Sequence, residues 1–163
     1  SLNAEFLGKA ETTPWPELCR ELARLGMIEP EALPLIERIW AFGVLIANQD
    51  MHPGNLSFLR TSRFEAKFPP AEPLQLAPVY DMLPMAYAPA RAGDRRQADS
   101  LAKVQLTPRI GKAVWLETYQ LAQNFWQQLS QDSRLSDEFR AIASASQLYL
   151  QQQILPALQR MAE

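Results

Sequence analysis

The chain has 163 residues, of which 47% are hydrophobic and 21% are charged, a composition typical of one globular domain rather than of a disordered segment. Its net charge of −2 argues against a surface dedicated to nucleic acid, and we claim no direct nucleic-acid binding. The longest apolar run, residues 39–47, is too short to span a bilayer, which takes a helix of ~20 apolar residues. The single cysteine, Cys19, excludes a disulfide within the chain and favours a reducing, cytoplasmic location.

The first part of the chain predicts two helices. Residues 14–26 begin with proline, carry leucines at every third or fourth position and end in glycine, which is the pattern of a short amphipathic helix with Leu18, Leu22 and Leu25 on its apolar side. Residues 31–48 predict a longer helix. Because this helix is apolar nearly all round from Ile39 onward, we expect it to be central rather than peripheral.

A small β-ribbon is predicted after these helices. Residues 55–59 and 74–77 alternate apolar and polar side chains, so they predict two short strands that could pair beside the helices. Residues 61–73 form a proline-punctuated loop between them. No period holds over residues 83–108, where we expect a loop.

The last third of the chain predicts helices again. Residues 111–130 carry a stripe of large side chains at helical spacing, more typical of a core than of a base-stacking platform: Trp115, Tyr119, Ala122, Trp126 and Leu129. Ser136 can cap a final helix whose first turn holds two acidic residues and which kinks or restarts at Pro156. Its apolar face would consist of Phe139, Ile142, Tyr149, Ile154 and Leu158. The predicted fold class is mostly α with a small β-ribbon.

The segment "NQDMHPGNLSFL", residues 48–59, holds the only histidine of the chain. Pro53 and Gly54 favour a type II turn with a positive φ at the glycine, and His52 is pushed toward an extended conformation because it precedes proline. Fully stretched, the chain would separate Asp50 from Asn55 by ~17 Å. A turn folds it back, so both side chains can face one cavity.

An aspartate and an asparagine offer hard oxygen ligands, which favour Mg²⁺ over Zn²⁺. Mg²⁺ held by few protein groups takes its other ligands from phosphate and water, so the segment suggests phosphoryl transfer. The spacing of Asp50 and Asn55 is that of the catalytic loop of protein kinases. A kinase needs a second metal carboxylate after a short strand, and Asp81, 31 residues beyond Asp50, occupies that position. The alternative is an ordinary polar turn that joins a helix to a strand.

Together, "FGVLIANQDMHPGNLSFL" and "LQLAPVYDMLP" resemble the C-terminal lobe of the HipA-like serine/threonine kinases, the toxins of bacterial toxin–antitoxin modules. The family carries a D-x-H-x-x-N loop after an apolar helix and then an L-x-P-x-Y-D segment. The likeness is clearest over residues 33–83. Beyond them the helices match only in general character.

The resemblance implies Mg²⁺ and ATP as cofactors and a role for each site residue. Asp50 would be the catalytic base, while Asn55 and Asp81 would hold the metal. His52 would line the nucleotide phosphates or brace the loop, or serve only as a structural hydrogen-bonding residue, and Tyr80 would sit beside the nucleotide. The substrate would be a serine or threonine of a bacterial protein, and family analogy suggests a DNA-binding antitoxin as partner.

The resemblance also implies a single domain, residues 1–163, built as a kinase-like C-terminal lobe. Its parts would be a catalytic loop at 48–57, a metal-binding segment at 74–83, an analogue of the activation segment at 84–108 and C-terminal helices at 110–161. The chain contains neither a G-x-G-x-x-G nor a Walker A sequence, so we expect the lobe that clamps ATP to lie before Ser1. By itself the chain should bind Mg-ATP feebly and phosphorylate nothing measurable.

Two other functions stay open. Aminoglycoside- and choline-type phosphotransferases carry a "DLHPGN" loop, which is closer still to "DMHPGN", but their metal segment is usually of a different type and comes at a shorter interval. The chain could also be a non-catalytic module that serves a DNA-binding regulator. Asp81 is followed by Met82 and Leu83, where conventional kinases have Phe-Gly, so the usual activation switch is not expected.

Residues 91–112 carry a net charge of +4. This charge could orient an acidic substrate or touch DNA phosphates, or it could belong to an ordinary solvated loop. The charged residues of this basic segment are Arg91, Arg95, Arg96, Lys103, Arg109 and Lys112 against Asp94 and Asp99.

Overall fold

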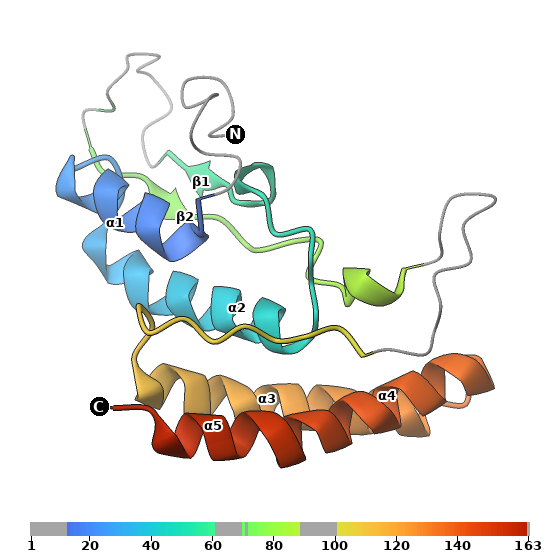
Figure 1. Cartoon of the computed structure of the whole chain (residues 1–163). Helices are drawn as coiled ribbons and strands as arrows, with labels where there is room; N and C mark the ends of the chain where they lie inside the picture. Colours follow the sequence, from blue (N-terminus) through green and yellow to red (C-terminus); the bar gives the residue numbers. More distant parts are fainter. Residues whose placement is uncertain (1–12, 61–69, 71, 89–100, 163) are drawn as a thin grey trace. The chain divides into compact units, whose positions relative to one another are not determined.

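The computed structural model describes residues 13–60, 70, 72–88 and 101–162 (Figure 1). In these ranges the chain is mostly helical, with one antiparallel pair of short strands, which confirms the predicted fold class. Its contacts divide the chain into two compact units, Ser1–Trp40 with Asp50–Met82 and Ala41–Gln49 with Leu83–Glu163. None of the helices described is long and apolar enough to cross a membrane.

The first unit begins with helix α1 (Trp15–Arg24), which starts directly after Pro14. A proline before the first turn costs nothing because the first amides of a helix have no partner inside it. Leu18 and Leu22 are buried as predicted. Leu25 is 51% exposed, so its predicted place on the apolar side is wrong: it is the residue that caps the helix, beyond the last regular turn.

Gly26 ends α1 as the sequence predicts. Its φ is 68°, in the left-handed region, and its N–H donates to the carbonyl of Ala23 at 2.9 Å. The N–H of Met27 donates to the carbonyl of Leu22, also at 2.9 Å. These two bonds form a Schellman motif, which satisfies the last carbonyls of the helix and turns Met27 into the core.

Helix α2 (Leu33–Leu45) follows a 3₁₀ turn (Pro30–Ala32) and ends three residues before the predicted boundary. Its end is a second Schellman motif, because Ala47 N–H donates to Val44 at 3.1 Å and Asn48 N–H donates to Gly43 at 2.9 Å. Ala47 has a φ of 60°, where an L-residue with a Cβ is strained. No glycine marks this end, which explains why the sequence pattern placed it too late.

Strands β1 (Phe58–Leu59) and β2 (Gln75–Leu76) pair in antiparallel register, Phe58 opposite Leu76, and confirm the predicted ribbon. The segment after α1 also joins it, through a parallel bridge between Ile28 and Leu74 that the sequence did not indicate. Most of the predicted loop at 61–73 lies outside the described residues.

Among the described residues of the first unit, a buried hydrophobic cluster includes the side chain of Cys19. That side chain is fully buried, and burial raises the pKa of its thiol to about 12 because the thiolate loses its hydration. The members of the cluster are Trp15, Leu18, Cys19, Leu22, Met27, Ile28, Ile36 and Leu56.

The second unit is built from helices α3 (Lys112–Gln131), α4 (Asp137–Tyr149) and α5 (Leu155–Arg160), with α4 and α5 joined by a π-helical turn (Leu150–Ile154). Figure 1 shows α3 lying alongside the other two. The aromatic stripe predicted for α3 is buried at Trp115, Tyr119 and Trp126. The predicted core role of these side chains is therefore confirmed.

Two local signals in this unit act as predicted. The Ser136 hydroxyl accepts a hydrogen bond from the N–H of Phe139 at 3.2 Å and so caps α4. Pro156 lies in the first turn of α5, directly after the π-helical turn. Proline has no N–H and its ring crowds the preceding turn, so the helix widens before it instead of continuing in one register.

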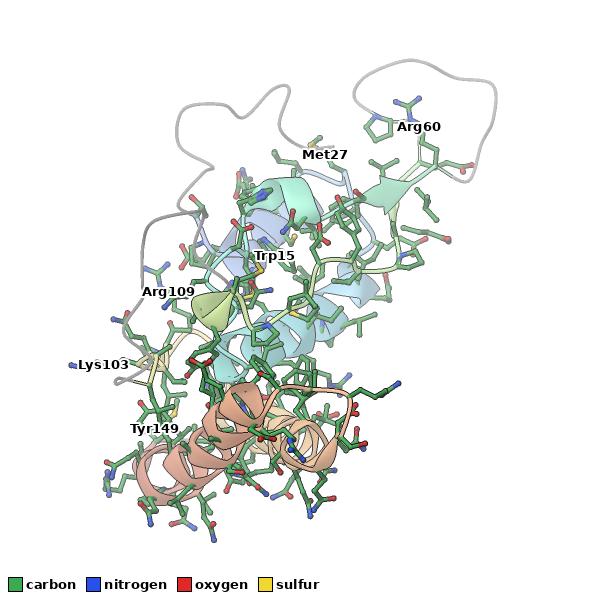
Figure 2. The ribbon with its side chains drawn as sticks, turned by 90° about the vertical axis from the view of Figure 1, so that its right-hand side faces the viewer. Trp15, Met27, Arg60, Lys103, Arg109 and Tyr149 are labelled. Carbon is green, nitrogen blue, oxygen red and sulfur yellow. The ribbon has the colours of Figure 1, made fainter. Side chains whose placement is uncertain are left out.

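Two tyrosines hold the segment that precedes α3. The Tyr87 hydroxyl accepts a hydrogen bond from the N–H of Ala102 at 3.1 Å, and the Tyr149 hydroxyl accepts one from the N–H of Val104 at 3.3 Å. Figure 2 shows Tyr149 beside the stretch that carries Lys103. The segment before α3 is irregular, so its backbone amides need partners outside regular structure. The two tyrosine hydroxyls are those partners, and the one on α4 keeps the segment beside that helix.

We predict that Gly26→Ala lowers the free energy of unfolding by about 1 kcal/mol, measured by urea denaturation. A Cβ at residue 26 would meet no atom within 4 Å, so the loss would come from the positive φ alone. Ala47→Gly is the matched control, because it removes a Cβ from the same position of the same motif and should raise stability. Equal effects of the two substitutions would contradict this account.

We predict that Cys19 is inert in the native chain. With a thiol pKa near 12, its thiolate fraction is negligible at pH 8, and the side chain is buried. Modification by an aromatic disulfide reagent at pH 8 should be at least about 100-fold slower in buffer than in denaturant. Rapid labelling under native conditions would show that α1 opens readily.

Candidate functional site

All five residues predicted for the site lie in the first unit, on the loop that follows α2 and on the segment that follows β2. Four of them have exposed side chains: Asp50, His52, Tyr80 and Asp81. Asn55 is the exception, since only 7% of it is exposed. The site thus combines one buried amide with carboxylates that reach solvent.

The loop bends at a 3₁₀ turn (Pro53–Asn55), held by N–H donation from Asn55 to the carbonyl of His52 at 3.0 Å and from Leu56 to that of Pro53 at 3.2 Å. Two successive bonds of this kind wind the chain in the right-handed sense. Gly54 therefore keeps a negative φ, and the predicted type II turn is wrong. The fold-back that the sequence predicted is present.

His52 is extended, as expected before proline, with φ −87° and ψ 160°. Its Nδ1 accepts a hydrogen bond from the N–H of Gly54 at 3.0 Å. The imidazole therefore caps the turn that its own backbone begins. The sequence left several roles open for His52. This hydrogen bond is of the kind expected if the imidazole braces the loop.

Asn55 ties the two ends of the loop together. Its Nδ2 donates to the carbonyl of Asp50 at 3.0 Å, and the same carbonyl accepts the N–H of His52 at 3.0 Å. Because Nδ2 donates to this carbonyl, the amide nitrogen of Asn55 faces the backbone of the loop. The oxygen, which is the atom that a metal ion would contact, is the end left for a ligand.

A tryptophan from α1 supports the loop, a contact that the sequence did not indicate. Trp15 Nε1 donates to the carbonyl of His52 at 3.1 Å, and the residue is 1% exposed. A buried indole N–H needs an acceptor, so a tryptophan in the first turn of an amphipathic helix is the signal that could have been noticed.

Tyr80 connects the segment after β2 to the turn. Its hydroxyl donates to the carbonyl of Gly54 at 2.6 Å and lies 3.3 Å from Ser57 Oγ. Asp81 follows directly, with a φ of 56°. Aspartate tolerates this left-handed conformation better than most residues but is still strained in it. The chain therefore changes direction at Asp81, one residue after its tie to the loop.

The donor set fits one kind of metal better than another. Within the residues that the structure describes, no three side chains of the His, Cys, Asp and Glu types gather as a metal cage. An amide oxygen at Asn55 and a carboxylate at Asp81 instead suit an ion that keeps waters and phosphate oxygens as ligands, as Mg²⁺ does. The residues present could therefore hold Mg²⁺, and magnesium stays a prediction.

The predicted basic segment is only partly described. Arg91, Arg95 and Arg96, with Asp94 and Asp99, lie outside the described residues, while Lys103 and Arg109 are exposed (Figure 2). Lys112 has a different task, because its Nζ donates to the carbonyls of Gln159 at 3.2 Å and Met161 at 3.1 Å. Its ammonium group thus places a positive charge at the C-terminal end of α5, which the helix dipole favours.

A comparison with known protein families covers both segments of this site. Residues 15–153 match the family described as the HipA-like C-terminal domain. The chain belongs to this family. The match includes both site segments of this HipA-like domain and confirms the resemblance seen in the sequence.

Among curated proteins, the domain is 41% identical over 143 residues to "Toxin YjjJ" of Escherichia coli (strain K12). The alignment covers 88% of this chain and 29% of that protein. The HipA-like domain therefore spans less than a third of the relative's length. No solved structure matches it.

We predict that Trp15→Phe loosens the loop at residues 50–56. The substitution keeps an aromatic ring in the core but removes the donor to His52, so stability should fall by about 1–2 kcal/mol. Amide exchange at Asn55 and Leu56, measured by hydrogen–deuterium exchange, should be faster than in the parent chain.

Trp115→Phe is the matched control for this experiment. Trp115 is also fully buried, and its Nε1 donates to a backbone carbonyl at 3.2 Å, that of Thr107 in the second unit. Its replacement should cost similar stability and leave exchange at Asn55 and Leu56 unchanged. If both substitutions speed exchange there equally, Trp15 has no specific hold on the loop.

Proposed function

We propose that this chain is the kinase-like C-terminal lobe of a protein kinase, which transfers the γ-phosphoryl group of Mg-ATP to a serine or threonine of a bacterial protein. The observation that carries the proposal is the loop at residues 50–55. There the amide of Asn55 is fixed with its oxygen end left for a ligand, and Tyr80 ties the segment of Asp81 to the same turn. Membership of the HipA-like family supports it.

Each site residue has one task in this reaction. Asp50 accepts the proton of the acceptor hydroxyl as the hydroxyl oxygen attacks the γ-phosphorus of ATP, and the bond from that phosphorus to the bridging oxygen breaks so that ADP leaves. Asn55 and Asp81 would hold Mg²⁺, which would neutralise charge on the phosphate oxygens. His52 keeps the loop in its bent form through the bond that Nδ1 accepts from Gly54.

We propose further that the whole protein acts in the cytoplasm as the toxin of a toxin–antitoxin module, with a DNA-binding antitoxin as partner. The support is the relative whose name is that of a toxin. Clamping of the ATP phosphates is assigned to residues outside this chain, since the chain itself has no glycine-rich phosphate loop. Activity therefore belongs to the whole protein.

A second candidate is a small-molecule phosphotransferase. The observation that favours it is the "DMHPGN" sequence of the loop, which is close to that of aminoglycoside- and choline-type enzymes. Both candidates use the same loop chemistry and differ only in the acceptor alcohol.

We predict that Asp50→Asn in the full-length protein reduces phosphoryl transfer by about 10²- to 10⁴-fold, since the loop loses its base but keeps its shape. The measurement is γ-³²P transfer from ATP, with mass spectrometry to find the modified protein. Glu138→Gln, an exposed acid on α4, is the control and should leave the rate unchanged.

Aminoglycosides and choline-like alcohols form the second panel of substrates. Transfer to one of them and to no protein would favour the second candidate. A rate that Asp50→Asn does not alter would remove Asp50 as the base, and would point to a module that binds without catalysing.

A further inference from the structure

We infer that Tyr80 is a latch, a positioning residue that ties the segment of Asp81 to the turn of Asn55, so that one divalent ion can bind both side chains. This inference rests on the proposed function and goes beyond the part that the sequence suggested for Tyr80, contact with the nucleotide. Its basis is that the hydroxyl group of Tyr80 already has partners within the protein.

The first observation is the bond itself. At 2.6 Å, the bond from the Tyr80 hydroxyl to the carbonyl of Gly54 is short even for an O–H donor. Ser57 Oγ lies 3.3 Å from the same hydroxyl, on the strand side of the turn. The phenol thus joins the segment after β2 to residues on either side of Asn55, across 26 and 23 positions of sequence.

The second observation is the backbone of the next residue. Asp81 holds a φ of 56°, a conformation that costs a non-glycine residue free energy and persists only where its surroundings impose it. On one side of Asp81 is the Tyr80 bond, and on the other is Met82, which packs against the core of the same unit. Both neighbours are anchored, so Asp81 cannot relax without breaking one anchor.

A third observation fixes the other ligand. Asn55 is buried, and its amide is bonded to the carbonyl of Asp50, so it cannot follow a shift of Asp81. Of the two side chains proposed to bind the metal, Asp81 is therefore the one whose position depends on an exposed contact, the hydrogen bond of Tyr80. Removal of the Tyr80 hydroxyl should let Asp81 leave the left-handed region and carry its carboxylate away from Asn55.

The test uses the full-length protein with Tyr80→Phe, which deletes one oxygen from a side chain that is 44% exposed and so should not unfold it. At saturating ATP, the Mg²⁺ concentration for half-maximal transfer should rise about three- to tenfold, as expected for the loss of one hydrogen bond that holds a segment. The KM for the protein substrate should not change, because the latch does not face the acceptor in this account.

A second readout does not need activity. Hydrogen–deuterium exchange should increase at Leu56, whose amide closes the turn, and at Ala77, whose N–H donates to the carbonyl of Ser57 at 2.9 Å. Ser57→Ala is the matched control. It removes the longer of the two hydroxyl contacts, leaves the bond to Gly54 and should behave like the parent protein in both measurements.

The outcomes separate the latch from the proposed function. If Tyr80→Phe leaves both the Mg²⁺ requirement and the exchange unchanged, the inference is overturned. If exchange rises but the Mg²⁺ requirement does not, Tyr80 braces the fold and does not position Asp81, which also overturns it. If the parent protein transfers no phosphate to any acceptor, the proposed function fails and takes the metal role with it, while exchange still shows whether the contact exists.

Discussion

The loop at residues 50–54 is held by side chains that donate hydrogen bonds to its backbone carbonyl groups. A loop that is neither helix nor strand must find other partners for its backbone, and this one finds them in side chains. Trp15 donates to His52, Asn55 to Asp50 and Tyr80 to Gly54. These donors come from α1, from the loop itself and from the segment after β2. The shape of the site therefore depends on three parts of the first unit at once.

Two non-glycine residues have left-handed backbone, one before this loop in the chain and one after it. Ala47 ends α2 and Asp81 follows Tyr80, with φ values of 60° and 56°. Strain of this kind is often found near functional sites, where a fixed geometry matters more than the last kcal/mol of stability. The two positions differ in kind: Ala47 completes a helix cap that glycine would complete with less strain, whereas aspartate at 81 brings a carboxylate that glycine cannot supply.

Local signals predicted the fold where a residue type dictates its own backbone, as Gly26 does after α1 and Ser136 does before α4. The stripe on α3 predicted burial because its period is that of a helix. Prediction failed at Ala47, which carries no mark of a helix end, and at Gly54, where proline and glycine suit more than one turn. The tie from Trp15 to His52 spans 37 positions, and local periodicity cannot reveal so distant a contact.

In the second unit, Lys112 joins two helix ends. Its ammonium group binds two carbonyls at the end of α5, so the first residue of α3 and the last turn of α5 lie together although 47 to 49 positions separate them (Figure 1). The two ends of this helical segment, residues 112–160, are therefore in contact although they lie far apart in the sequence. The last carbonyls of α5 have no partner inside their own helix, so the first turn of α3 supplies one, and fraying at either helix end would break the contact.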